Sequence, residues 1–390
     1  MAIISYKLDE VIIEDRDIFC EMLTYVSPEI LAIKQTGDTV LLECTDAHEE
    51  DVIEKVGYLV EIFSRTDVRA GSSVKIKTLS DFTSNHPINN QPIFEELISN
   101  GSIYSTTDGA YVYSGIFLDV FNYFSAKIAS YGKETFRGIK SFEAPVLQSI
   151  TEYEKGGYFE SFPHHIMFQS SLKSDIENIN EYSKLDSKEK EIVKYLQSPS
   201  NILRHAACVP VYPMLQDMKI DSPEPVSIMV SGRCFRNEGK NVFELARLNE
   251  FNMKEFVFIG EQEQVNEHVK KAKALWDYWI ELFELNGLIA TANDSFFANN
   301  YKKLKVFQII GDSKQELKLL LPSSQKLCAV SSANYHRTHF TKSYNIKSDN
   351  VYAHTACVAF GIERLTYSLL SQKGICPEKW DSATLKEIYA

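Results

Sequence analysis

The first 85 residues alternate between short stretches of helical and of strand periodicity. Apolar residues at positions 52, 53, 56, 59, 60 and 63 fall on one face of a helix, so their spacing predicts an amphipathic helix over 49–65. The second half of 11–26 has the same periodicity, and 38–45 is typical of a short strand. We therefore expect a small α/β module at the N-terminus.

A stretch rich in Pro and Asn, 83–92, follows and predicts a linker or a domain entrance. Beyond it the pattern shows no second break. It predicts one long helix at 267–287 and strands at 240–245, 254–260, 317–322 and 357–361. Their hairpin-like spacing favours an α+β fold, an antiparallel sheet flanked by helices. We divide the chain into a small acidic α/β module, 1–85, and one large domain, 86–390.

The segment 172–196 is unusually polar and rich in Lys, Glu and Asp. One interpretation is a solvent-exposed helical insertion, and the other is an element that docks a partner. Both interpretations stay open on the pattern alone.

Composition adds little to the fold but bounds the location. Hydrophobic residues make up 44% and charged residues 24%, as in ordinary globular proteins. No apolar stretch approaches the length of a membrane span, and the N-terminus lacks the features of a signal peptide. The 7 cysteines are scattered and odd in number, which favours a reducing compartment and metal or packing roles. We expect a cytoplasmic protein with no membrane segment.

The charge of the chain bears on its partners. The formal charge is −12, and residues 1–85 hold 17 acidic against 8 basic side chains, so −9 of it lies there. Proteins that bind a phosphate backbone usually present a basic face, which disfavours nucleic acid as the main partner. Neither a GxGxxG nor a GxxxxGK(S/T) motif occurs, so we expect no Rossmann or P-loop phosphate cradle.

Residues 231–260 combine side chains suited to a nucleotide on what we predict to be two strands joined by a loop. The candidates are Arg236, Glu238, Arg247, Phe251 and Glu255. Arginine offers a planar fork of donors for phosphate, an aromatic ring offers a surface for a base, and a carboxylate can accept from an amine. Taken alone, an Arg–Glu pair on a strand is more often a cross-strand surface pair.

Residues 354–365 read as an apolar strand that ends at Gly361 and passes into a helix. Arg364 would lie in the first turn of this helix, where a guanidinium and helix N–H groups can both face an anion. The alternative is a core strand and helix in which Glu363 and Arg364 simply face water.

A third stretch, 138–149, is a predicted strand stopped by Pro145. In their order along the chain, the three stretches resemble the signature motifs of class II aminoacyl-tRNA synthetases: a strand before a Pro, an FRxE…R…F…E hairpin, and a looser form of the GxGxER turn. The resemblance covers about residues 86–390. It implies an antiparallel class II sheet that binds ATP in a bent form, and a homodimer joined through the first motif.

Four further stretches, at 160–168, 206–215, 331–346 and 354–364, resemble the amino acid–carrier protein ligases. These ligases are homologues of the catalytic domain of the atypical zinc-dependent seryl-tRNA synthetases. The resemblance implies that Arg236 holds the α-phosphate and Arg364 the γ-phosphate of ATP. It also implies that Glu238 contacts the adenine amino group, Phe251 stacks on adenine, and Arg247 contacts a phosphate.

The same resemblance implies a zinc ion in the amino-acid pocket, held by Cys208, Glu255 and Cys357. Three protein ligands leave a fourth position open, which the free α-amino group of the substrate would take. Without the family resemblance the spacing is too long to indicate a metal site, and buried free cysteine is common.

For Mg²⁺ the sequence departs from the seryl-tRNA synthetases, because 325–334 lacks the acidic residue expected there. Asn334 is present, and we expect it at the ATP site. Glu316 is the nearest upstream carboxylate and is our candidate to bind Mg²⁺ instead.

The implied reaction is ATP-dependent activation of a small amino acid (Gly, Ala or Ser) as its adenylate, with Arg236 and Arg364 as the catalytic groups. The amino acid would then pass to the phosphopantetheine thiol of an acyl or peptidyl carrier protein. A tRNA acceptor is disfavoured, because the acidic first 85 residues would repel a phosphate backbone. The carrier could dock on 172–196 through its lysines, Lys184, Lys188, Lys190 and Lys194. Two alternatives stay open: a tRNA-linked synthetase-type enzyme, and a non-catalytic synthetase paralogue.

Overall fold

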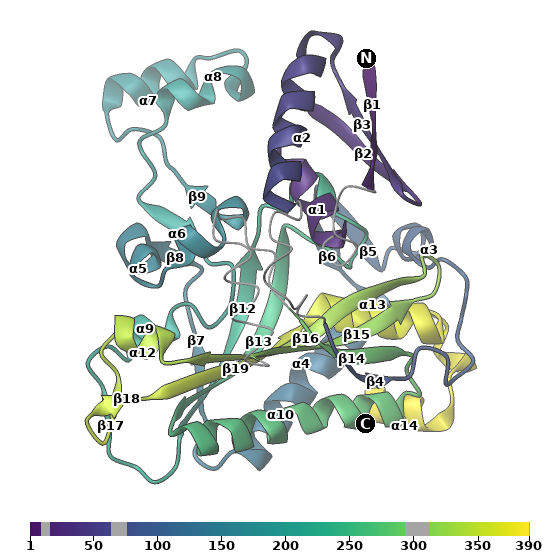
Figure 1. Cartoon of the computed structure of the whole chain (residues 1–390), viewed down its shortest axis with the longest axis vertical. Helices are drawn as coiled ribbons and strands as arrows, with labels where there is room; N and C mark the ends of the chain where they lie inside the picture. The colour runs from purple at the N-terminus through teal and green to yellow at the C-terminus, as the bar shows by residue number, and fades with distance from the viewer. Residues whose placement is uncertain (9–15, 64–75, 293–312, 390) are drawn as a thin grey trace.

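A computed structural model describes residues 1–8, 16–63, 76–292 and 313–389 of the chain (Figure 1). Within these residues the largest feature is an eight-stranded sheet of order β4-β14-β15-β16-β19-β13-β12-β7. Its strands are β4 (Thr78–Asp81), β14 (Gly287–Thr291), β15 (Lys314–Leu321), β16 (Lys326–Arg337), β19 (His354–Gly361), β13 (Glu250–Gly260), β12 (Val226–Phe235) and β7 (Lys140–Glu143). Neighbouring strands are antiparallel except β7 and β12, which run parallel. The predicted antiparallel α+β architecture is confirmed.

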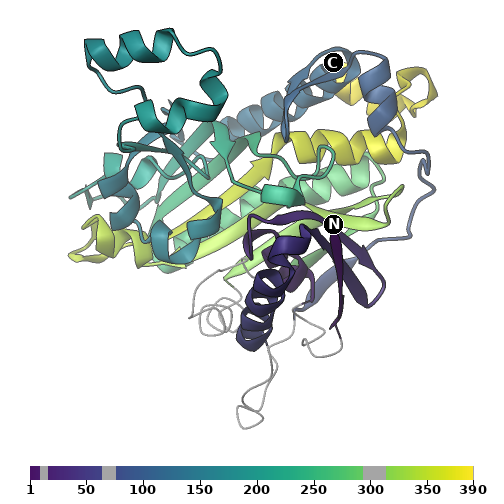
Figure 2. The same cartoon turned by 90° about the horizontal axis from the view of Figure 1, so that it is seen from above.

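Three long helices cover one face of this sheet (Figures 1 and 2). They are α4 (Gly115–Thr135), α10 (Gln262–Leu282) and α13 (Ile362–Lys373). Trp276 and Trp279 of α10 are buried here, and Trp279 meets Phe360 of β19 edge to face at 5.9 Å. These aromatic side chains remove large apolar areas from water and anchor the helices to the strands.

Most predicted elements are found with bounds shifted by a few residues, and two differ more than the rest. The helix predicted at 267–287 begins earlier, at Gln262, and ends at Leu282, because Gly287 already starts β14. The strand predicted at 240–245 is wrong: this stretch is part of the loop between β12 and β13, with a 3₁₀ turn (Gly239–Asn241) and one isolated bridge between Phe243 and Arg247.

Short elements cover the opposite face of the sheet and form a second apolar cluster with it. They are β8 (Leu147–Ser149), β9 (Met167–Gln169), β10 (Asn201–Leu203), α5 (Ile150–Lys155), α6 (Tyr158–Ser161), α9 (Val211–Met214) and α12 (His339–Ser343). The smaller pieces around the body of the domain are α3 (Phe94–Ser99), β5 (Ile103–Thr107), β6 (Ala110–Tyr113), β11 (Lys219–Ile220), β17 (Lys347–Ser348), β18 (Val351–Tyr352) and α14 (Ser382–Tyr389).

The N-terminal elements close a separate core, and we call residues 1–63 the N-terminal unit. Its sheet of order β1-β3-β2 is antiparallel, and its elements are β1 (Ala2–Lys7), α1 (Arg16–Met22), β2 (Ile30–Thr36), β3 (Thr39–Cys44) and α2 (Glu49–Phe63). The apolar face of α2 is buried against this sheet, as its periodicity predicts. The division of the chain at residue 85 stays a proposal; β4, just before it, belongs to the large sheet.

Residues 172–196 form a pair of short helices, α7 (Ile176–Ser183) and α8 (Lys188–Tyr195), which project from the body (Figure 1). Asp175 begins α7 by accepting a hydrogen bond from the backbone N–H of Glu177. Among the described residues, no helix has the length and apolarity needed to cross a membrane.

Candidate functional site

The strand register brings the predicted site residues that lie on strands to one face of the sheet. Asn334 of β16 lies directly opposite Cys357 of β19, and Cys357 lies opposite Val257 of β13. Residues opposite each other in antiparallel strands share a face, as do residues two apart on one strand. Glu255 therefore joins Cys357 and Asn334 on the face that the short elements cover.

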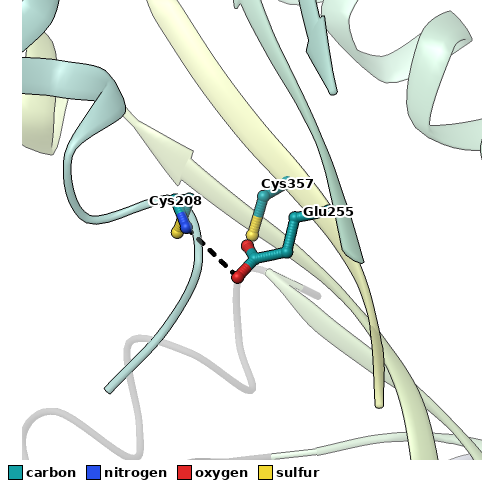
Figure 3. Close-up of side chains that lie close together, drawn as sticks. All are labelled: Cys208, Glu255 and Cys357. Atoms are coloured by element: carbon teal, nitrogen blue, oxygen red, sulfur yellow. Dashed lines mark hydrogen bonds between the residues drawn. The ribbon is translucent and has the colours of Figure 1, made fainter. Parts of the chain in front are cut away.

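Cys208, Glu255 and Cys357 converge in this face (Figure 3). Glu255 and Cys357 project from adjacent strands, and Cys208 comes from the loop before α9. Their potential ligand atoms all lie within 4.8 Å of one another, and all three side chains are buried. The Glu255 Oε1 also accepts from the backbone N–H groups of Ala207 at 2.7 Å and Cys208 at 3.2 Å, which fixes the loop to the strand.

The electrostatics of this cluster suit a bound cation. Burial raises the pKa of Glu255 to about 7, and the charge of Cys357 adds to that rise. A hydrogen bond from Cys208 lowers the pKa of Cys357, and the same contact raises that of Cys208. Without a cation, three buried acidic groups this close keep protons rather than ionise together, and a cation among them would stabilise their ionised forms. Two sulfurs and one carboxylate fit a divalent metal that accepts thiolate.

Asn334, which we expected to contact ATP, lies beside this cluster. Its Nδ2 donates to the Sγ of Cys357 at 3.6 Å and to the hydroxyl of Ser332 at 3.1 Å. The sequence reasoning missed His336, whose Nε2 lies 3.7 Å from the same sulfur. The alternation of β16 was the one available signal, because it gives Asn334 and His336 the same face.

Arg236 and Phe251 form the centre of the predicted nucleotide site. The guanidinium carbon of Arg236 lies 5.1 Å from the centre of the Phe251 ring, and its Nε donates to the carbonyl of His205 at 3.2 Å. Arg236 follows the end of β12 rather than lying on the strand, whereas Phe251 is on β13. A guanidinium held over a ring can meet a phosphate with its remaining donors.

Glu238 and Arg247 lie in the loop between β12 and β13 and form an ion pair at 3.3 Å. Glu238 is buried, and Arg247 also pairs with Glu21 of the N-terminal unit. Burial opposes the charge on Arg247, but these two carboxylates raise its pKa above the ordinary value. The loop is thus held by charges from both parts of the chain.

Arg364 lies in the first turn of α13, and its Nη1 donates to the carbonyl of Ala329 at 3.0 Å. Glu363 beside it is 1% exposed and accepts from the backbone and side-chain N–H groups of Asn252. The alternative in which Glu363 faces water is therefore wrong. Its carboxylate ties the start of α13 to β13 and so orients Arg364.

Glu316, our candidate for Mg²⁺, lies opposite Ser332 and so shares the face of the cluster. It forms ion pairs with Lys314 at 3.0 Å and Lys318 at 3.3 Å. A cation bound by Glu316 would have to compete with these two ammonium groups.

A cavity of about 610 Å³ lies on the other side of the sheet, between α10 and the ends of β16 and β19. Among its described lining residues are Lys270, Lys273 and Arg337, and none of the predicted site residues is among them. Its size alone does not make it the reaction site, since the chemistry gathers on the opposite face.

Comparisons with known proteins identify the family of the chain. Residues 195–373 match the family described as tRNA synthetase class II core domain (G, H, P, S and T). The chain is 30% identical over 283 residues to amino acid–(acyl-carrier-protein) ligase 2 of Bradyrhizobium diazoefficiens, covering 70% of this chain and 81% of the relative. It is 29% identical over 255 residues to the type-2 serine–tRNA ligase of Methanocaldococcus jannaschii, covering 63% of this chain and 49% of the relative.

Among solved structures, the fold resembles M. kandleri SerRS in its complex with A. aeolicus tRNASec. The TM-score is 0.69 at 20% identity, over 99% of this chain and 77% of the other. The chain therefore belongs to the class II tRNA synthetase superfamily, as a ligase homologous to the amino acid–(acyl-carrier-protein) ligases and to the catalytic domain of the type-2 seryl-tRNA ligases.

Proposed function

We propose that this protein activates a small amino acid with ATP as its adenylate and transfers it to the phosphopantetheine thiol of a carrier protein. The observation that carries this proposal is the buried cluster of Cys208, Glu255 and Cys357, on the same sheet face as the side chain of Phe251. The name of the relative that aligns over 81% of its own length supports the carrier protein as acceptor.

The cluster is our proposed zinc site, and its residues would recognise the amino acid. Bound there, zinc would supply an open position for the free α-amino group of the substrate. The two backbone N–H groups on Glu255 keep its carboxylate directed at the two sulfurs. Tyr212 and Phe340 belong to the same buried apolar group as the two cysteines and stack on each other at 4.2 Å, so a substrate held at the cluster would be Gly, Ala or Ser rather than a larger amino acid.

The phosphate side of the reaction rests on positioned charge. The substrate carboxylate attacks the α-phosphorus, and the bond to pyrophosphate breaks as the new P–O bond forms. Arg236 would stabilise the charge on the α-phosphate and Arg364 that on the γ-phosphate, while Phe251 stacks on adenine and Glu238 accepts from its amino group. Mg²⁺, with Glu316 as its candidate ligand, would neutralise part of the remaining phosphate charge.

The projecting α7–α8 pair is our candidate docking element for the carrier. It exposes apolar side chains on both helices, with Ile176 75% and Val193 80% exposed. Lys184, Lys188 and Lys194 are exposed on the same pair of helices, and each could meet a carboxylate on the acidic surface common in carrier proteins. The side chain of Lys190 lies outside the described residues.

A tRNA-linked activity is the second candidate. The likeness to a seryl-tRNA synthetase over 99% of this chain favours it, because it includes the N-terminal unit. The formal charge of −12 works against it. We also retain the cytoplasm as the predicted location. We further propose a homodimer joined through β7, the end strand of the sheet, and light scattering can test whether the protein is a dimer.

The first experiment is amino-acid-dependent exchange of pyrophosphate into ATP, across the common amino acids, with and without a zinc chelator. We expect exchange with one or two small amino acids, lost on chelation and in Cys357→Ala. Cys328→Ala is the matched control, since Cys328 is also buried but lies outside the cluster. Transfer is then followed to a phosphopantetheinylated carrier protein and to tRNA in parallel. Exchange that is indifferent to zinc, or transfer to tRNA alone, would contradict the proposal.

A further inference from the structure

His336 occupies an irregular position in β16. Asn334 pairs with Cys357 and Tyr335 with Ala356, but the next pair joins Arg337 to Thr355, so His336 is the extra residue of a β-bulge. Arg337 follows it with a left-handed backbone, at φ +56°. Bulges redirect side chains and left-handed non-glycine residues are costly, so both are expected where a side chain must point in one direction.

The ring of His336 is held at both nitrogens. Its Nε2 lies 3.7 Å from the Sγ of Cys357. Its Nδ1 lies 3.0 Å from the hydroxyl of Thr355 and 3.2 Å from that of Tyr212, and these two hydroxyls lie 3.0 Å from each other. The Phe340 ring packs edge to face against the imidazole of His336, with the ring centres 4.9 Å apart and the ring planes at 77°.

The hydrogen-bonding capacity of the neighbouring groups determines which nitrogen of the His336 ring carries the proton. A thiolate only accepts hydrogen bonds, so a thiolate at Cys357 requires the proton on Nε2 of His336. Nδ1 is then an acceptor, and the two hydroxyls can meet it: Tyr212 donates to Thr355, and Thr355 donates to Nδ1. Tyr212 and Thr355 are both fully buried, so no water competes for this chain of bonds.

We propose that His336 is a positioning residue that donates its Nε2–H to the sulfur of Cys357 and so holds that sulfur ready for the metal. This proposal rests on the proposed zinc site. With Asn334, the Cys357 sulfur then accepts two N–H donors, which orient its free lone pair towards Cys208 and Glu255. Such supporting hydrogen bonds tune metal affinity by about 10- to 100-fold.

The test compares two substitutions of one side chain. His336→Phe keeps an aromatic ring but has no donor, whereas His336→Gln keeps an N–H that can reach the sulfur. The control is His354→Phe. His354 lies on β19, the strand that carries Cys357, but its ring contacts the hydroxyl of Tyr335 rather than the Cys357 sulfur. Zinc affinity is measured by competition with a chelator. We expect His336→Phe to bind zinc about 10- to 100-fold more weakly, His336→Gln to lose less than about tenfold, and the control to match the wild type.

Cobalt in place of zinc gives a readout that a merely structural role would not move. Loss of the N–H donor makes the thiolate a better electron donor, so we expect the thiolate-to-cobalt charge-transfer band of His336→Phe to move to longer wavelength. The band of His336→Gln should stay close to that of the wild type. If His336→Phe does not fold, the double variant Tyr212→Phe with Thr355→Val keeps the ring, removes both hydroxyls within reach of Nδ1, and should change affinity and band in the same directions.

Three outcomes would overturn the inference. Equal zinc affinity and an unmoved band in His336→Phe would show that the histidine does not act on the sulfur. His336→Gln as weak as His336→Phe would make His336 a ligand rather than a donor. A wild-type protein that binds neither zinc nor cobalt would remove the metal site of the proposed function as well, so the two failures are distinguishable.

Discussion

Glu21 of the N-terminal unit forms an ion pair with Arg247, which lies 226 residues later in the loop between β12 and β13. Three further bonds join the same surfaces: Tyr25 Oη donates to the carbonyl of Asn237 at 2.6 Å, the backbone N–H of Lys240 to Thr24 Oγ1 at 2.6 Å, and Asn241 Nδ2 to the carbonyl of Glu21 at 2.8 Å. The N-terminal unit therefore holds the loop that carries an expected phosphate ligand.

We predict that Glu21→Gln lowers the KM for ATP, because Glu21 and a phosphate compete for Arg247. A partly exposed ion pair contributes about 1 kcal/mol, which corresponds to about a fivefold change. Pyrophosphate exchange at varied ATP measures it. Asp17→Asn, on the exposed side of the same helix, removes the same charge and should leave the KM unchanged. A raised KM in Glu21→Gln would mean that Glu21 supports ATP binding instead.

We predict that Phe251→Leu raises the KM for ATP about five- to tenfold with little change in kcat. The ring contributes stacking to bound adenine before and during the reaction, so its loss weakens both states alike. Phe168→Leu, on β9 and half exposed, is the control. A fall in kcat at constant KM would assign Phe251 to the chemical step.

We predict a pH-dependent effect of Glu363→Gln on stability. Burial raises the pKa of Glu363 from 4.5 to about 7, so between these values the folded chain keeps a proton that the unfolded chain has lost. Through this group the free energy of unfolding therefore falls as the pH rises across that window, by on the order of 3 kcal/mol. A glutamine at 363 cannot ionise, so the free energy of unfolding of the variant should lack this pH-dependent decrease.

Urea unfolding of both proteins at about pH 5 and about pH 8 checks it, because other groups titrate equally in the two. The unfolding free energy of the variant relative to the wild type should increase towards the higher pH. A constant difference would show that Glu363 is already ionised in the folded chain.

We predict that Gly239→Ala destabilises the protein more than Gly138→Ala does. Both glycines have positive φ, at +55° and +72°, so an alanine at either costs about 1 kcal/mol of backbone strain. Only at 239 would the added Cβ meet another atom, Thr24 Oγ1 at 2.6 Å; at 138 nothing lies within 4 Å. Equal losses in urea unfolding would mean that the N-terminal unit moves aside without cost.

The periodicity of the sequence was enough to predict an antiparallel sheet with flanking helices, α10 among them, and the amphipathic α2, because each of these elements has an apolar face that must be buried. It did not predict α4. The cluster of Cys208, Glu255 and Cys357 was predictable only through the family resemblance. Glu255 lies 47 residues after Cys208 and 102 residues before Cys357. Periodicity indicates which face of a strand or helix a residue occupies, but not which distant residues pack beside it.

Other features escaped the sequence for physical reasons. Val-Phe-Glu-Leu at 242–245 favours a strand, but these residues lie in the loop that the N-terminal unit contacts. Glu363 was open to a solvent-exposed interpretation because charged side chains at helix starts are usually exposed; its burial depends on donors from Asn252, which is remote in sequence. The sequence around His336 contains no residue pattern that would predict the β-bulge there.

The contact between Thr24 and Gly239 also sets a limit on how this chain can diverge. One position on the N-terminal unit and one in the loop between β12 and β13 constrain each other, so a substitution at either is tolerated only with an adjustment at the other. A homologue without the N-terminal unit would be released from this constraint, and its counterpart of Gly239 could become Asn, which also accepts positive φ. Across an alignment, the identity of this one residue should therefore follow the presence or loss of a unit more than 170 residues upstream.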